Sequence, residues 1–219
     1  ERLQTLKSKG FKAIVGLKPR RQQDIIERMK IAANAGVVAF TIDLDSAGRA
    51  ARATKGQTVE PKTPEQLREL VKASPLPLFF KGILTTDEAL LCLNAGAAGI
   101  VVSNHGGRVL ADEPGTAEVL PAIADAIHGR CMILVDGCVK RGTDVEKYIA
   151  LGADACLAGR HFVRGAHGAL ADGVELFANT IRNELAVAMT LTGAAKVKDI
   201  NRKMIRMTTP PPLAFGVPA

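Results

Sequence analysis

A short pattern that recurs three times restricts the fold of this chain more than any other feature. In each copy a helix-forming segment ends at a glycine and is followed at once by a short apolar run. Glycine commonly ends a helix because it adopts the left-handed backbone conformation without steric cost, and such apolar runs are typical of strands buried on both faces. The recurrence predicts a parallel sheet whose strands are joined by helices. The three copies are residues 34–36 before 37–43, 94–96 before 97–103, and 150–152 before 153–159.

The rest of the chain extends the pattern to six strand–helix units. Two helix starts carry capping boxes, Thr63 with Gln66 and Thr85 with Glu88, in which side chain and backbone cap each other. The expected strands are residues 12–16, 37–42, 76–80, 98–103, 131–135 and 154–158. The expected helices are residues 20–35, 63–73, 85–95, 116–128, 141–151 and 160–191, the last of them broken.

Two segments lie outside these units. Residues 44–62 are rich in Arg, Gly and Thr and too long for a plain connector, so we expect a lid or disorder there. The segment 206–219 contains three consecutive prolines, which exclude a helix, and is expected to form an extended arm. The predicted organisation is one domain over residues 1–205 followed by this tail.

Six units are compatible with two architectures. A closed eight-fold barrel of strand–helix units needs about 250 residues, and this chain has 219. A ring of only six strands leaves two unpaired edges, which folded proteins avoid. Either two further strands come from sequence outside this chain, or the sheet is open and doubly wound.

Composition narrows the classes of function. The net charge is +7, but the basic residues are scattered and aromatics are only 4% of the chain, so we expect no nucleic-acid partner and instead an attraction for small anions. No apolar run reaches the roughly 18 residues of a membrane span, and the polar N-terminus is unlike a signal peptide. The four cysteines stand singly, so we expect reduced core thiols, a cytoplasmic protein and no metal site.

One strand ends in residues that favour a catalytic role. The apolar run 99–102 is followed by Ser103, Asn104, His105, two glycines and Arg108. In parallel α/β barrels the carboxyl ends of the strands carry the functional side chains. A His and an Arg at such an end predict a base and a cation, and the glycines allow a ligand to approach the backbone.

Four linked segments resemble the FMN-dependent α-hydroxy acid dehydrogenases and oxidases, the family of glycolate oxidase, lactate oxidase and the flavin part of flavocytochrome b2. They are residues 80–83, 103–108, 135–145 and 158–160, and the resemblance extends from about residue 11 to about residue 205. It implies a (β/α)8 TIM barrel with FMN at the carboxyl ends of the strands. It also implies that this chain starts just before the third strand, so that two strands and an active-site Tyr near them are absent.

The resemblance places FMN on residues from several strands. Loops 136–140 and 159–160 correspond to the family's phosphate-binding loops, where a helix N-terminus with a cation suits a phosphate. Cys138 and Lys140 stand there for a family Gly and Arg. Lys81 corresponds to the cation beside the flavin ring that stabilises its reduced form. The cofactor-binding residues implied in this way are Thr41, Lys81, Ser103, Asp136, Gly137, Lys140, Gly159 and Arg160.

The resemblance also implies a reaction. His105 corresponds to the base, Asp43 to the carboxylate that orients it, and Arg108 to the cation that binds the substrate carboxylate. The implied activity is oxidation of a small, lactate- or glycolate-like 2-hydroxy acid to the 2-oxo acid, by a protein that forms homo-oligomers, often tetramers in this family. The alternatives are a barrel that binds FMN without turnover or with an altered substrate, and a fragment that folds only with its missing N-terminal piece.

Several positions of the substrate site depart from the family pattern. Residues 13–15, Ala-Ile-Val, align with a family Gln-Leu-Tyr, which removes a flavin contact and the Tyr that hydrogen-bonds the substrate. Ala50 aligns with a second substrate Arg, which Arg49 or Arg52 replaces only if the loop shifts. Tyr148, the single tyrosine, falls in an expected helix and is no substitute. The motifs therefore identify the cofactor more firmly than the substrate.

Overall fold

Six parallel strands in sequence order form the sheet at the centre of the molecule. The computed structural model describes residues 2–48 and 58–208. Each strand pairs in parallel with the strand next to it in the chain, so the spatial order is β1-β2-β3-β4-β5-β6. The strands are β1 (Ile14–Leu17), β2 (Ala39–Asp43), β3 (Leu78–Ile83), β4 (Gly99–Val102), β5 (Met132–Val135) and β6 (Ala155–Cys156). All six predicted strands are confirmed, with ends that differ by a few residues.

Helices connect the strands as predicted. The α-helices are α1 (Arg2–Ser8), α2 (Gln22–Asn34), α4 (Pro64–Ala73), α5 (Thr86–Asn94), α6 (Thr116–Ile127), α7 (Gly142–Ala150) and α8 (Arg160–Thr192). The 3-10 helices are η1 (Leu44–Gly48), η2 (Val197–Asp199) and η3 (Arg202–Met204). Both predicted capping boxes are present, at Thr63 and Thr85. The predicted break in the last helix is confirmed, because Ala169 and Leu170 leave the helical conformation inside α8.

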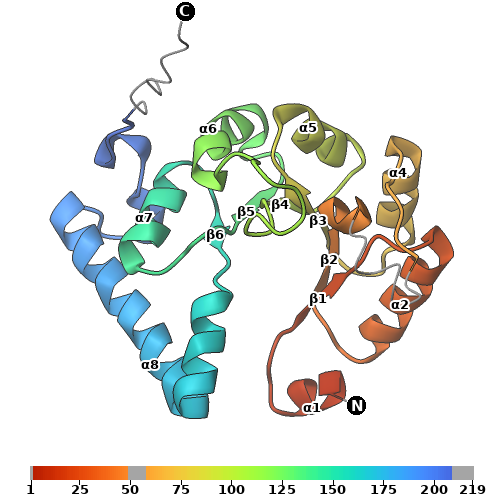
Figure 1. Cartoon of the computed structure of the whole chain (residues 1–219), viewed down its shortest axis with the longest axis horizontal. Helices are drawn as coiled ribbons and strands as arrows, with labels where there is room; N and C mark the ends of the chain where they lie inside the picture. The colour runs from red at the N-terminus through yellow and green to blue at the C-terminus, as the bar shows by residue number, and fades with distance from the viewer. Residues whose placement is uncertain (1, 49–57, 209–219) are drawn as a thin grey trace, which may run out of the picture.

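The position of the helices decides between the two predicted architectures. The strands form an arc, and α2 and α4 to α7 all lie on its outer side (Figure 1). A doubly wound sheet carries helices on both faces, so that alternative is wrong. Within the described residues β1 pairs only with β2 and β6 only with β5, so the arc is an incomplete α/β barrel of six strand–helix units.

Side chains alternate between the two faces of the arc, as the pleat of a strand requires. The outward side chains form the main core beneath the helices and include Phe40, Ile42, Phe80, Ile100, Ile133 and Val135, all fully buried. The inward side chains form a second, smaller cluster of Ala39, Phe79, Val101 and Leu134, with Leu157 packed against it. The inward positions change from apolar to polar at the carboxyl end of the strands, and this edge carries the candidate site.

Three expectations fall partly or wholly outside the described residues. Of the predicted lid or disordered segment, residues 44–48 form η1, and residues 49–57, which include Ala50, are not described. The predicted extended arm begins at Arg206, and residues 209–219 are also not described. The arm, the lid and the alignment of Ala50 with a second substrate Arg therefore stay predictions.

The cysteines only partly match the expected core thiols. All four are free, and burial raises the pKa of the Cys92 thiol to about 12. Cys138, by contrast, is exposed on the loop after β5, so the prediction of a core thiol there is wrong. Within residues 2–48 and 58–208 there is no helix long and apolar enough to cross a membrane, and no cluster of three or more metal-binding side chains.

Candidate functional site

A row of five polar side chains runs across the carboxyl end of β1 to β5. Lys18 forms an ion pair with Asp43, which is the register partner of Lys81 on the next strand. The Lys81 Nζ lies 2.5 Å from Ser103 Oγ and 2.9 Å from Asp136 Oδ2. Positive and negative groups alternate along the row, so each partly buried charge has a partner of opposite sign, which offsets the cost of burying it.

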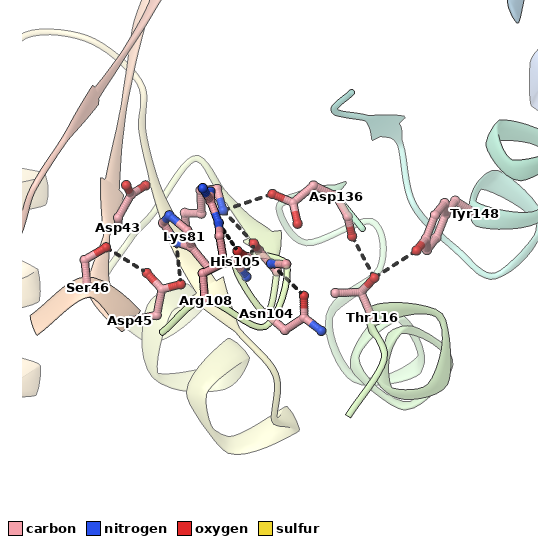
Figure 2. A network of polar contacts seen from close by, with 12 residues as sticks. Asp43, Asp45, Ser46, Lys81, Asn104, His105, Arg108, Thr116, Asp136 and Tyr148 are labelled. Atoms are coloured by element: carbon pink, nitrogen blue, oxygen red, sulfur yellow. Dashed lines mark hydrogen bonds and ion pairs between the residues drawn. The ribbon is translucent and has the colours of Figure 1, made fainter. Parts of the chain in front are cut away.

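The carboxylate that contacts His105 is Asp45 rather than the predicted Asp43. His105 Nδ1 lies 2.8 Å from Asp45 Oδ2, and both side chains are about nine-tenths buried, with 11% and 9% exposed (Figure 2). Asp43 points instead to Lys18, which directly follows the neighbouring strand β1. The 3-10 helix η1 follows β2 directly and turns the chain back over the sheet edge, which brings Asp45 to the histidine. The predicted Asp43–His105 contact is therefore corrected.

Gly82 makes the Asp45 contact possible. A bulge interrupts the pairing of β3 with β4 between Lys81 and Ile83, and Gly82 within it has φ +93°. A Cβ at this position would lie 2.5 Å from the Cβ and Cγ atoms of Asp45. Only glycine combines this backbone conformation with the necessary space. The Phe80–Ile83 segment therefore helps to position His105, because it leaves room for Asp45.

The contact with Asp45 determines which nitrogen of His105 can act as a base. An ionised carboxylate only accepts hydrogen bonds, so Nδ1 carries the proton in this pair. In a neutral imidazole the other nitrogen, Nε2, then holds a free lone pair. The His105 backbone, at φ 53°, is held by its own N–H to Ser103 Oγ at 3.1 Å and by Arg108 Nε to its carbonyl at 3.2 Å. The loop thus presents a preoriented proton acceptor.

Glu113 approaches the same pair from the outer side. It lines, together with Asp45, a cavity of about 540 Å³, and its Oε2 is buried without a hydrogen-bond partner in the described part of the chain. Burial raises the pKa of the Glu113 carboxyl, and the Asp45 and Glu88 carboxylates raise it further. The Glu113 carboxyl therefore takes up a proton at a higher pH than an ordinary glutamate does.

A second cavity, of about 320 Å³, lies on the inner side of His105 and is rich in cations. Lys140, Arg160 and Arg164 line it, and within the described residues none of these three side chains forms an ion pair. The Arg160 guanidinium lies close against Gly106, where a Cβ would be 3.1 Å from Nη2. Unpaired cations beside the first turn of α8 form a donor set suited to a phosphate group. The cavity is lined by Lys81, His105, Gly106, Arg108, Asp136, Gly137, Cys138, Val139, Lys140, Leu157, Gly159, Arg160, His161 and Arg164.

Most of the predicted site residues thus meet at one place. The cavity lining includes His105, Arg108, and all of the predicted cofactor residues except Thr41 and Ser103. Ser103 lies directly behind it, bonded to Lys81. Thr41 lies on the inner face of β2, opposite Gly16 of β1. Asp43 does not line the cavity: it forms an ion pair with Lys18 and is the register partner of Lys81, which does line it.

Two buried hydroxyl groups support the loop after β5, and sequence reasoning missed this role. Thr116 Oγ1 donates to the Asp136 carbonyl at 2.6 Å (Figure 2), and the Tyr148 hydroxyl donates to the Gly137 carbonyl at 2.7 Å. Burial raises the pKa of Tyr148. A Cβ at Gly137, whose φ is +124°, would collide with Thr116. The turn is therefore shaped by α6 and α7 packed beneath it.

Cys138 is held in a conformation that favours glycine, with φ 52°. We expect Cys138→Gly to raise the free energy of unfolding by about 1 kcal/mol, because the left-handed conformation costs a residue with a Cβ about that much. Urea unfolding of the two proteins measures the difference. Cys138→Ala is the matched control, since it removes the thiol and keeps the Cβ. An equal gain in both variants would show that the thiol, and not the backbone, is responsible.

Comparison with known proteins gives a consistent result. A family model described as FMN-dependent dehydrogenase matches residues 4–207. The L-lactate oxidase of Lactobacillus jensenii is 42% identical over 154 residues, which are 70% of this chain and 37% of that protein. A peroxisomal (S)-2-hydroxyacid oxidase of Arabidopsis thaliana is 43% identical over 142 residues, 65% of this chain and 38% of that protein.

Solved structures agree in fold. A variant of mandelate oxidase, determined with the monooxide FMN adduct, superposes with a TM-score of 0.83 at 34% identity and covers 91% of this chain and 65% of its own. By contrast, the chain spans less than two-fifths of the length of the two curated relatives named above.

Proposed function

The chain belongs to the family of FMN-dependent dehydrogenases, and from this premise we propose that it forms the FMN-binding part of an enzyme that oxidises a small 2-hydroxy acid to the 2-oxo acid. The observation that carries the proposal is the His105–Asp45 pair at the rim of a cavity rich in unpaired cations. The names of the relatives, L-lactate oxidase and (S)-2-hydroxyacid oxidase, support the substrate class.

The residues around the cavity fit FMN in charge and kind. Lys140 and Arg160, with main-chain N–H groups near Gly137 and Gly159, would hold the phosphate. Lys81, itself held by Asp136, would lie beside the ring, with Thr41 and Ser103 as hydroxyl partners. When bound, FMN supplies the two-electron acceptor that no protein side chain provides.

The chain's own residues would do the proton chemistry. Arg108 lines the cavity next to His105, and its guanidinium can bind a carboxylate through two parallel hydrogen bonds. His105 Nε2 accepts a proton from the substrate, and Asp45 stabilises the imidazolium that forms. Lys81 contributes a fixed positive charge at the edge of the same cavity.

A second candidate is a barrel that binds FMN without oxidising a hydroxy acid. It is favoured by the segment 13–18 in and around β1, Ala-Ile-Val-Gly-Leu-Lys, which contains no Tyr to hydrogen-bond a substrate. This candidate keeps the phosphate-binding residues and makes His105 dispensable. Reduction of the flavin by substrate therefore separates the two functions.

We also propose that two further strands, from sequence outside this chain, close the arc, and that the whole protein is a cytoplasmic homo-oligomer. The two sheet edges, β1 and β6, lack partners within the described residues. Free cysteines suit a reducing compartment. Light scattering coupled to size exclusion, on the full-length protein, measures the oligomeric state.

Arg160→Met tests the phosphate site. We expect it to weaken FMN binding by about 10- to 100-fold, because a hydrogen bond to a charged group contributes about 1.5–3 kcal/mol. Fluorescence titration of the full-length apoprotein with FMN measures the dissociation constant. Arg182→Met, on the same helix α8 but away from the cavity, is the matched control. Unchanged affinity in Arg160→Met would refute the assigned phosphate site.

A further inference from the structure

Lys18 extends an ammonium group over the inner side of the sheet, directly after β1. Its side chain is 24% exposed, and its ion-pair partner Asp43 is 10% exposed. An ammonium has three N–H donors. Within the described residues, Asp43 Oδ2 is the acceptor that Lys18 contacts, so two donors remain available to a ligand.

The register of β1 shows which of its residues face the candidate site. Gly16 is paired with Thr41, and a Cβ on Gly16 would lie 3.4 Å from the Thr41 hydroxyl oxygen. Two residues further along, Lys18 reaches Asp43. Because side chains alternate along a strand, Gly16 and Lys18 share the inner face. Ala13 and Val15 pack against the main core on the outer face, so the residues that face the site at the strand end are Gly16 and Lys18.

The charges along the sheet edge balance, so binding of a further anion depends on hydrogen-bond donors that are still free. Lys18 and Lys81 are balanced by Asp43 and Asp136, and Lys81 already donates to Ser103 and Asp136. A substrate carboxylate that enters this edge therefore needs donors that are not yet used. Arg108 supplies them on the β4 side, and Lys18 supplies them on the β1 side.

We propose that Lys18 is a second cationic contact for the carboxylate of the substrate, acting together with Arg108. The proposal rests on the proposed function, since it concerns the same 2-hydroxy acid. It makes Lys18 a binding residue that sets substrate affinity, and it leaves the proton transfer to His105. Asp43 then holds the ammonium in place and partly competes with the substrate for it.

Binding of pyruvate, a 2-oxo acid that serves as a non-reacting probe, tests the proposal. In the full-length protein loaded with FMN, we expect Lys18→Met to raise the calorimetric dissociation constant about 10- to 100-fold. Lys18→Arg keeps most of the affinity, and Asp43→Asn increases it. Lys12→Met, a change of an exposed lysine just before β1, is the matched control and leaves binding unchanged.

A double variant distinguishes direct contact from mere support of the fold. If Lys18 only neutralises Asp43, the variant Lys18→Met/Asp43→Asn recovers the affinity of the unmodified protein, and the proposal is overturned. If Lys18 contacts the carboxylate, the double variant binds pyruvate as weakly as Lys18→Met. In steady-state oxidation the Lys18→Met effect falls on KM rather than kcat. An unmodified protein that binds no pyruvate and is not reduced by any 2-hydroxy acid would instead count against the proposed function.

Discussion

Replacing His105 by glutamine lowers the rate constant for flavin reduction by a 2-hydroxy acid about 10²- to 10⁴-fold, the usual contribution of a general base. The reason is that glutamine offers no group that takes up a proton near neutral pH. FMN affinity stays unchanged, because the phosphate-binding cations lie on other loops. Anaerobic stopped-flow mixing of the FMN-loaded full-length protein with L-lactate or glycolate measures the rate from the loss of flavin absorbance.

His128→Gln is the control for this experiment, since His128 is an exposed residue at the end of α6. It should leave the reduction rate unaltered. If His105→Gln is reduced as fast as the unmodified protein, His105 is not the base. If the unmodified protein itself is never reduced by a panel of 2-hydroxy acids, the flavin-binding alternative is correct.

Asp45→Asn lowers the same rate constant by up to about 10⁴-fold, as expected when a histidine base loses the partner that selects its tautomer. The asparagine amide can donate a hydrogen bond to Nδ1, which moves the imidazole proton to Nε2. The nitrogen that faces the substrate then carries a hydrogen and no longer accepts one. The measurement is again anaerobic flavin reduction, at saturating substrate.

Asp43→Asn is the informative comparison for Asp45→Asn. It leaves the His105–Asp45 contact intact, so its effect should appear in substrate affinity and only weakly in the reduction rate. A larger loss of rate in Asp43→Asn than in Asp45→Asn would favour the carboxylate that sequence comparison predicted. The pair of variants therefore tests the correction made by the structure.

Strands and helices were predictable because their signals are local. The glycine after each helix and the apolar run that follows it lie within about ten residues, and the two capping boxes within four. The main element that sequence reasoning missed is α1, a short polar helix without an acidic residue in its first turn. Whether the strands form an arc or a doubly wound sheet depends on which face the helices cover, and no local pattern carries that information.

Within the candidate site, the types of residue were predictable and their partners were not. His105 and Arg108 follow a buried strand and Lys81 lies near the end of another. The carboxyl ends of parallel strands meet at one edge, so the proximity of these residues could be predicted. Asp43 and Asp45 are both acidic and lie two residues apart, and the sequence offered no means to choose between them for His105. Nothing in the sequence distinguishes Lys18 from an ordinary solvated lysine at the end of a short strand.

The sequence by itself determined the strand–helix repeat, the family and most of the cations around the cavity, because each rests on short motifs of neighbouring residues. Only the tertiary structure decided that Lys18 pairs with Asp43 and that Asp45 pairs with His105, contacts between residues 25 and 60 positions apart. The first follows from the register of β1 against β2, and the second from the space that Gly82 leaves in β3. Strand register and close packing bring distant residues together, and neither is encoded at a single position.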